Sequence, residues 1–360
     1  MISNLLSGDL PRSRMLSAML LAVLLGLALA PFLFHGARSL NVAATICVFV
    51  VLVASYDLLL GYTGIVSFAH TMFYGIGAYG VGLALHGMGP TWSAVLVGTV
   101  AALAVSLVLA LVIGLFSLRV RAIFYAMITL AVAAAFAVLA SQLSDFTGGE
   151  DGRTFKVPEL LQPGFHLMEG EFFGRALDGK LITYYLVFFS ALALFLLMLR
   201  IVNSPFGRVL QAIRENDFRA EALGYRTVVY RTLANCLGAL IATLAGVLMA
   251  LWLRYVGPKT MLSFEVMTDI LLIVVIGGMG TVYGAVIGSA LFILMQNYLQ
   301  VLMKEASAAM AGAPLLANLF HPDRWLLWLG VLFVLSVYFF PAGIVGKLRA
   351  GAQARSGRRP

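Results

Sequence analysis

Apolar residues follow one another without alternation along most of this chain. Runs of about 20 such residues can cross a ~30 Å hydrocarbon core as helices, whereas the strands of a membrane β-barrel alternate. Spans are predicted near residues 15–34, 40–60, 67–86, 91–118, 122–141, 182–202, 231–253, 266–281, 284–303 and 325–340. The pattern predicts an all-α polytopic membrane protein, with about ten transmembrane helices and some glycine-broken segments, in a single domain over 1–360.

A polar segment at residues 203–230 has the signals of two short helices. Ser204 can cap a first helix, and Pro205 suits its first position. Asn216 favours a turn and a second cap, and Gly224 can end the second helix. We therefore expect two amphipathic helices in this loop.

Composition agrees with a membrane protein. Hydrophobic residues make up 61% of the chain and charged residues 11%, against roughly 45–50% and about 25% in ordinary soluble domains. Such a chain could not cover a soluble surface with polar groups.

Cys47 and Cys236 both lie in apolar runs, which predicts buried, inert thiols.

The distribution of charge predicts an orientation. If the N-terminus is inside, ten crossings return the C-terminus to the same side. The inner segments, including 203–230 and the basic tail 341–360, then contain fifteen Lys and Arg and four acids. The outer segments, including the turn-rich loop 141–180, contain nine basic and ten acidic residues. By the positive-inside rule both termini are cytoplasmic and 141–180 is periplasmic, in a bacterial inner membrane. The net charge of +8 therefore reflects topology and does not indicate nucleic-acid binding.

Two glycine-rich segments, 60–79 and 277–284, are predicted to interrupt helices. Irregular backbone at membrane depth is tolerated only where protein shields it or where it lines a cavity. We therefore predict that the translocation path follows these segments, with the candidate residues Gly61, Tyr62, Gly64, Ser67, Phe68, His70, Gly277, Gly278 and Gly280.

Close helix packing is the alternative use of these glycines. Gly280, Gly284 and Gly288 recur every four residues, which would place them on one helix face where a second backbone can approach. Gly284 and Gly288 are assigned to helix packing.

Two acidic residues, Asp57 and Asp269, fall within spans. Insertion of such a charge costs roughly 2.5–3.5 kcal/mol, so each should face protein or water. They could contact the substrate path or relay protons, or they could lie at helix ends and cap the following turn. His70 has the same ambiguity.

No catalytic motif is visible in the sequence. The chain has no phosphate-binding loop, no Gly-x-Ser-x-Gly and no His-Glu-x-x-His. We expect no cofactor on this chain, no metal site and no enzymatic activity, so any ATP hydrolysis belongs to other chains.

The loop at 203–230 also carries a family resemblance. The run Ala212-Ile213-Arg214-Glu215-Asn216, followed by Glu221-Ala222-Leu223-Gly224, resembles the coupling loop of ATP-binding-cassette (ABC) importer permeases of the branched-chain amino acid, LivM-like family. Further motifs of that family follow in order at 60–64, 67–70, 75–79, 118–119, 125–130, 147–152, 276–281, 283–285 and 340–344. Together they cover most of the chain.

The resemblance implies a permease subunit that works by alternating access. Its expected partners are a second related permease, two ABC ATPase subunits that hold ATP and Mg, and a periplasmic substrate-binding protein. Leu223 would enter a groove on the ATPase, with Glu221 at the rim. The expected ATPase-coupling residues are Arg214, Glu215, Asn216, Asp217, Glu221, Ala222, Leu223 and Gly224.

Two questions stay open at this point. The substrate could be a branched-chain amino acid or a related small polar or carboxylate solute, such as urea, an amide or an aromatic carboxylate. The alternative function is a secondary transporter driven by an ion gradient, which predicts paired buried charges beside broken helices. The chain has the breaks but few buried charges.

Overall fold

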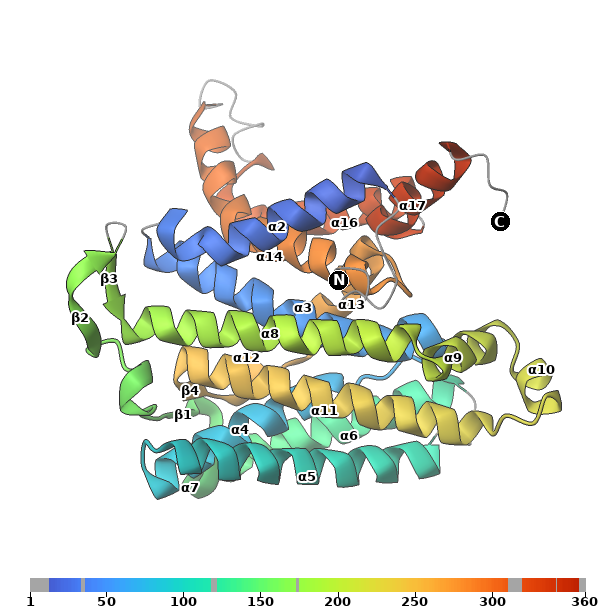
Figure 1. The fold of residues 1–360 in the computed structure, drawn as a ribbon, viewed down its shortest axis with the longest axis horizontal. Coiled ribbons are helices and arrows are strands. Elements are labelled where there is room, and N and C mark those ends of the chain that lie inside the picture. The colour runs from blue at the N-terminus through green and yellow to red at the C-terminus, as the bar shows by residue number, and fades with distance from the viewer. Residues whose placement is uncertain are drawn as a thin grey trace.

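The computed structural model describes residues 13–33, 36–117, 122–172, 175–309, 319–340 and 342–355. Long helices dominate it, and several of them run roughly along the long axis of Figure 1. They are α2 (Arg14–Leu33), α3 (Ala37–Thr63), α4 (His70–Met88), α5 (Trp92–Ser117), α6 (Ala122–Gln142), α8 (Gly179–Asn203), α11 (Thr227–Leu253), α13 (Phe264–Gly277), α14 (Val282–Ala309) and α16 (Trp325–Phe339). The prediction of an all-α polytopic fold is confirmed.

Nine helical segments in these ranges are long and apolar enough to cross a membrane. Ten spans were predicted from the sequence. The predicted span without a counterpart among these nine segments is 67–86, which corresponds to α4. This 19-residue helix does not belong to the nine, and it is buried between α5 and α11. Its glycines give it a less apolar composition, while its position inside the bundle shields it from lipid.

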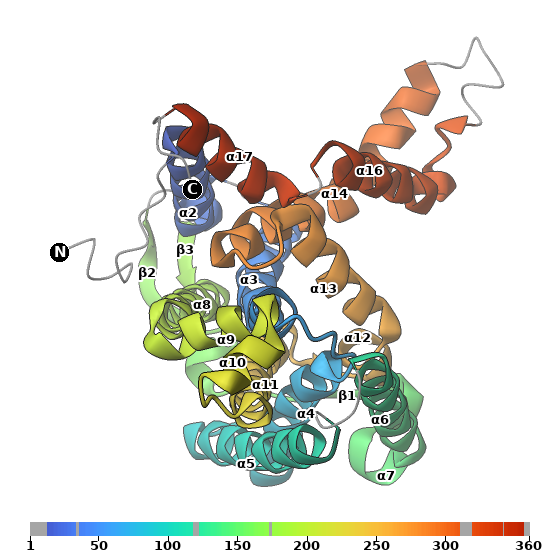
Figure 2. The same ribbon diagram turned by 90° about the vertical axis from the view of Figure 1, so that its right-hand side faces the viewer.

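Helix α3 lies at the centre of the bundle. Viewed end-on, the other helices surround it (Figure 2), and it packs against α8, α11, α13 and α14. Nearly all of its residues from Leu40 to Thr63 are buried. By contrast, α2, α5 and α6 leave most of their apolar side chains exposed, as expected for helices that meet lipid or another membrane subunit.

The two ends of the bundle carry different structures. At one end, hereafter the α10 end, lie α9 (Pro205–Glu215) and α10 (Asp217–Ala222), on the right in Figure 1. The C-terminal helix α17 (Gly343–Arg355) forms much of the predicted basic tail; residues 356–360 lie outside the described ranges.

The opposite end, hereafter the hairpin end, is built from short elements. They are α7 (Ser144–Thr147), η1 (Gly149–Asp151), β1 (Arg153–Thr154), η2 (Glu159–Leu161), β2 (His166–Phe172), β3 (Arg175–Asp178), β4 (Tyr255–Val256) and α12 (Pro258–Met261). A further short element, η3 (Pro322–Arg324), contacts α14 and α16. Strand β1 pairs antiparallel with β4, and β2 pairs antiparallel with β3. Gly148, Gly149 and Gly152 have positive φ, which residues with side chains rarely adopt. The segment 141–180 is therefore a structured loop that also contains a hairpin, which the sequence pattern did not predict.

Glycines bring helix backbones into direct contact. A Cβ on Gly246 of α11 would collide with the Tyr74 carbonyl of α4, and one on Gly77 would collide with the Thr243 carbonyl. On α14, Gly284 faces the Gly277 backbone and Gly288 faces the Ile273 carbonyl of α13. Inside lipid there is no hydrophobic driving force between helices. Close packing of their backbones is therefore a main source of helix association.

One part of the glycine prediction is wrong. Gly280 does not share a helix face with Gly284 and Gly288, because α14 begins at Val282 and Gly280 precedes it with φ +78°. The two cysteines are buried free thiols, as expected.

A substitution on α14 tests this packing. In Gly284→Leu the first side-chain atom would lie 2.5 Å from Thr281 Oγ1 and 2.9 Å from the Gly277 backbone. We expect a destabilisation of about 1–3 kcal/mol from overpacking, measured as a lower thermal midpoint in detergent. Gly330→Leu is the control, because a Cβ there meets no described atom within 4 Å. Equal midpoints for the two variants would contradict this packing.

Candidate functional site: the coupling loop and the glycine breaks

Helices α9 and α10 form a compact helix–turn–helix at the α10 end. The Ser204 hydroxyl accepts from the Gly207 N–H at 3.4 Å, and Pro205 is the first residue of α9. The Asn216 side chain accepts from the Arg219 N–H at 2.9 Å and caps α10. Gly224 has φ +90° and donates to the Glu221 carbonyl. The predicted caps and glycine stop are therefore confirmed.

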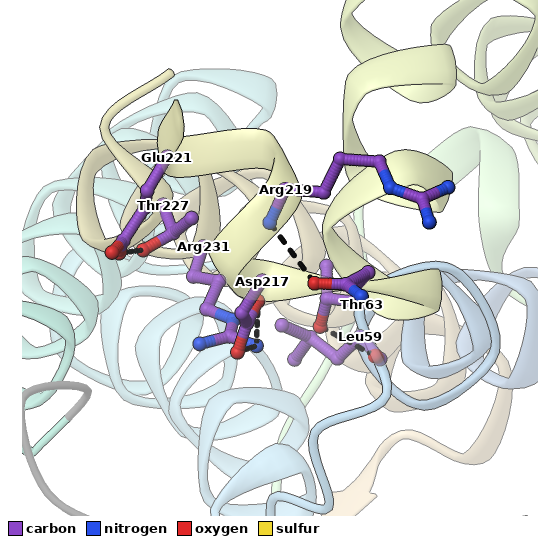
Figure 3. A network of polar contacts seen from close by, with 8 residues as sticks. Leu59, Thr63, Asp217, Arg219, Glu221, Thr227 and Arg231 are labelled. Carbon is purple, nitrogen blue, oxygen red and sulfur yellow. Dashed lines mark hydrogen bonds and ion pairs between the residues drawn. The ribbon is translucent and has the colours of Figure 1, made fainter. Parts of the chain in front are cut away.

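Two side-chain contacts fasten α10 to the start of α11 (Figure 3). Arg231 donates to both Asp217 carboxylate oxygens at 2.7 and 2.8 Å. Thr227 donates to Glu221 Oε1 at 2.6 Å. Glu221 was expected at the rim of an interface. In the structure its carboxylate also accepts a hydrogen bond from the first residue of α11. These contacts make the loop and α11 one unit.

Two apolar side chains, Phe218 in α10 and Leu223 directly after it, lack cover in the described structure. Phe218 is 86% exposed and Leu223 is 71% exposed. Ala220 is buried against the loop, whereas Ala222 and Glu215 are exposed. Leu223 was expected as an apolar knob. Phe218 was missed, although a phenylalanine in a polar segment is a signal that could have identified it.

The glycine breaks are shorter than predicted. Helix α3 continues to Thr63 and α4 starts at His70, so the first break is limited to residues 64–69. The second covers residues 278–281, between α13 and α14. Gly277 and Gly284, at the limits of the second predicted segment, lie within helices.

The candidate path residues divide between the two breaks. Gly61 and Tyr62 are buried in the last turn of α3, and Gly64 follows with φ +73°. Ser67 is buried in the first break. In the second, Gly278 is buried with φ +115° and packs against Gly343 at the start of α17.

His70 is a buried core residue in this structure. Its Nε2 lies 2.8 Å from Ser55 Oγ, which itself donates to the Leu52 carbonyl. The ring packs edge-on against Tyr56, with centroids 5.2 Å apart. These contacts attach the start of α4 to α3.

Neither of the two acids in the spans caps its own helix. Asp57 is followed by six further residues of α3, and its Oδ1 accepts from the Gly280 N–H at 2.8 Å. Asp269 lies within α13 and accepts from the Gln296 side chain of α14 at 3.2 Å. The helix-end interpretation is therefore wrong for Asp57, which ties α3 to the second break.

Arg214 connects α9 to the same place. Its Nη1 donates to the Gly61 carbonyl, and a Cβ on Gly280 would lie 2.9 Å from both that Nη1 and the Gly61 oxygen. The structure therefore brings together the coupling loop, the end of α3 and the second glycine break, which lie far apart in the sequence.

A pocket of about 400 Å³ lies between α6, α13 and the region before and at the start of α4. Most of its lining is apolar, and Phe68 stacks on Phe264 beside it, with ring centroids 6.2 Å apart. Glu150 and Lys259 provide one acid and one base at the hairpin end. Of the predicted path residues, Phe68 lines this pocket.

Comparison with known proteins now decides the family. Residues 38–319 match the family described as branched-chain amino acid transport system, permease component. The chain belongs to this family. It is a transport permease, and its apolar helices make it a multi-pass membrane protein.

Relatives of two kinds match this permease. It is 27% identical over 354 residues to the high-affinity branched-chain amino acid transport system permease protein LivM of Salmonella typhimurium, covering 94% of this chain and 77% of the relative. The Escherichia coli LivM is 26% identical over 319 residues, covering 84% and 73%. The Salmonella typhimurium LivH is 24% identical over 262 residues, covering 71% and 83%. No solved structure matches the permease.

Most of the motifs that carried the resemblance lie in described regions. Residues 118–119 and Pro341 are outside them. The motif at 147–152 forms the glycine turns of the hairpin end, and the motif at 276–281 forms the second break. These two motifs therefore lie where the backbone leaves regular helix.

Gly224 provides a test of the loop. A side chain there meets no described atom within 4 Å, so Gly224→Val would act through its backbone at φ +90°. Left-handed backbone costs about 1–2 kcal/mol for residues with a Cβ. We expect faster amide hydrogen exchange across α10 in the detergent-purified permease. Ala222→Val, in the helix itself, should exchange like the unaltered protein; equal acceleration in both variants would contradict the glycine stop.

Proposed function

We propose that this permease is the membrane-spanning subunit of an ABC importer that carries branched-chain amino acids into the cytoplasm. The observation that carries this proposal is the capped loop of α9 and α10, which presents Phe218 and Leu223 outward and is bonded to both α11 and α3. A solvated linker would not need such attachment, whereas an element that another protein moves would need it.

The proposed partner at this surface is an ABC ATPase subunit. Large side chains that become buried when two proteins bind, with polar residues around them, are the usual hot spots of protein interfaces. Around the two anchors lie exposed charged residues, including Glu215 and Arg219. Arg214 faces the bundle instead, so among the predicted coupling residues it connects the docking surface to the membrane helices.

The orientation proposed from charge places the α10 end and both termini in the cytoplasm. The loops at 203–226 and 278–281 meet at one end through Arg214 and Gly280. The acid-rich loop 141–180 forms much of the opposite end (Figure 1). Segments assigned to the same side by charge are therefore together in space, which supports the cytoplasmic assignment of the α10 end.

The remaining proposed partners are a second permease, a second ATPase and a periplasmic binding protein. Similarity to both LivM and LivH relatives supports a pair of related permeases. The exposed apolar faces of α2, α5 and α6 are available for lipid and for that second subunit. The hairpin end would receive the binding protein, while ATP and Mg would be held by the ATPases.

The pocket suits part of the proposed route. A branched-chain amino acid has an apolar side chain and carries one positive and one negative group. The pocket has an apolar wall with Glu150 and Lys259 at the hairpin end. Substrate entering from that end would meet both charges first, and its side chain would then contact Phe68 and Phe264.

The docking proposal is tested by a double substitution. Phe218→Glu combined with Leu223→Glu places charges at both anchors. Loss of such anchors costs about 2 kcal/mol or more, roughly thirtyfold in affinity, so the ATPase should no longer co-purify with the permease. Phe146→Glu is the control, because Phe146 is also exposed but lies in α7 at the hairpin end. Full ATPase recovery with the double variant would contradict the docking assignment.

The pocket is tested with a pair of adjacent alanines on α6. Both alanines are exposed, but Ala134 lines the pocket and Ala135 does not. Ala134→Trp adds a side chain with roughly 150–250 Å² of surface, which would fill much of the pocket. We expect a large loss of radiolabelled leucine uptake in reconstituted vesicles with ATPase binding intact. Ala135→Trp should transport normally; equal uptake by both variants would exclude the pocket from the route.

A further inference from the structure

Three segments that are distant in the sequence meet at one point near the α10 end. Asp57 and Gly61 come from the last turns of α3, Gly280 from the second break, and Arg214 from the last turn of α9. Gly280 donates its N–H to Asp57, and Arg214 donates to the Gly61 carbonyl. We call these four residues the α3–α9 joint.

The two glycines of the joint are required by its geometry. A Cβ on Gly61 would collide with the Asp57 carboxylate and with the Gly280 nitrogen. A Cβ on Gly280 would lie 2.9 Å from Arg214 Nη1 and 2.9 Å from the Gly61 oxygen. Gly280 also has φ +78°, which favours glycine. Both positions therefore allow two backbones and two charged side chains to approach one another.

The joint places a buried acid, Asp57, near the basic side chain of Arg214. Asp57 is 2% exposed, and its Oδ2 has no hydrogen-bond partner within the described part of the chain. The Arg214 Nη1 lies beside Gly280, the residue whose N–H this carboxylate accepts. Burial of a charge costs free energy of solvation. Only an oppositely charged partner and hydrogen bonds can offset this cost. The Gly280 N–H and the neighbouring Arg214 are the groups in the described structure that act to offset this cost for Asp57.

The connections of the joint exceed what structural support of one helix would need. Through Gly61 it holds the end of α3, immediately before the first break. Through Gly280 it holds the α13–α14 break, and through Arg214 it holds α9, whose neighbour α10 carries Phe218. Movement of α9 therefore cannot leave either break unaffected unless these bonds are exchanged.

We propose that Asp57 and Arg214 are positioning residues that transmit movement of α9 to both glycine breaks at once. This inference rests on the proposed function, because it takes the ATPase as the source of that movement. Arg214 pulls on the Gly61 carbonyl, and Asp57 passes the displacement to the Gly280 N–H. The two glycine breaks then move together rather than independently.

The test separates coupling from folding and from docking. Asp57→Ala removes the acceptor and the charge, Arg214→Gln removes the charge, and Asp57→Ala/Arg214→Gln removes both. Asp269→Asn is the matched control, since Asp269 is a second intramembrane acid with a hydrogen-bond partner, Gln296, on another helix. Each complex is purified with its ATPase and reconstituted, and leucine uptake and ATP hydrolysis are measured in the same vesicles.

We expect these four variants, and the rescue variant Arg214→Lys, to retain the ATPase. Mutations along a coupling network change coupling by 0.5–2 kcal/mol, so uptake per ATP should fall by about two- to thirty-fold in each single joint variant. The double variant should lose little more than the worse single one, because both residues act in one connection. Asp269→Asn should keep the normal ratio, and Arg214→Lys, which retains the charge, should restore part of it.

Two results would overturn the proposal. In the first, Asp57→Ala and Arg214→Gln lower protein yield or thermal stability while uptake per ATP stays normal, which would make the joint a structural support. In the second, the single losses multiply in the double variant, which would show independent roles. Absence of a co-purifying ATPase from the unaltered permease would instead refute the proposed function, and the transmission role with it.

Discussion

Backbone N–H and carbonyl groups cannot remain unpaired in lipid, and the rest of this structure depends on how two interrupted helices satisfy that constraint. In the first break, the Phe68 N–H donates to Thr129 on α6, and the Gly61 carbonyl just before it accepts from Arg214. In the second, the Gly280 N–H donates to Asp57, and the Gly278 carbonyl accepts from Thr281. Each break is therefore closed by side chains, most of them from other helices.

This solution has a consequence for the loop outside the bundle. Because Arg214 provides one of the closing bonds, α9 is held against the membrane helices. Helix α10 is held in turn to α11 through Asp217–Arg231 and Thr227–Glu221. The apolar surface that would dock an ATPase is thus connected, through hydrogen bonds and the short chain between α9 and α10, to the places where the transmembrane helices are broken. The account of coupling follows from this continuity.

Local signals in the sequence were enough to predict much of this architecture. Apolar runs located the long helices to within a few residues, and Ser204, Asn216 and Gly224 located the caps and the stop of the loop. The partner of Asp57 could not be predicted, because Gly280 lies 223 positions away and nothing local marks the pairing. The extent of the first break was overestimated, since glycines such as Gly77 serve close helix packing inside α4.

The central claim is that the outer face of α10 contacts an ABC ATPase in the cytoplasm. It is tested most directly by a photoreactive phenylalanine analogue at Phe218, irradiated in native membrane vesicles that contain the whole transport system. The account predicts a crosslink to the ATPase subunit, and none to it when the analogue replaces Phe146 at the hairpin end. A crosslink from position 218 to a periplasmic binding protein or only to lipid, or an ATPase crosslink from position 146, would contradict it.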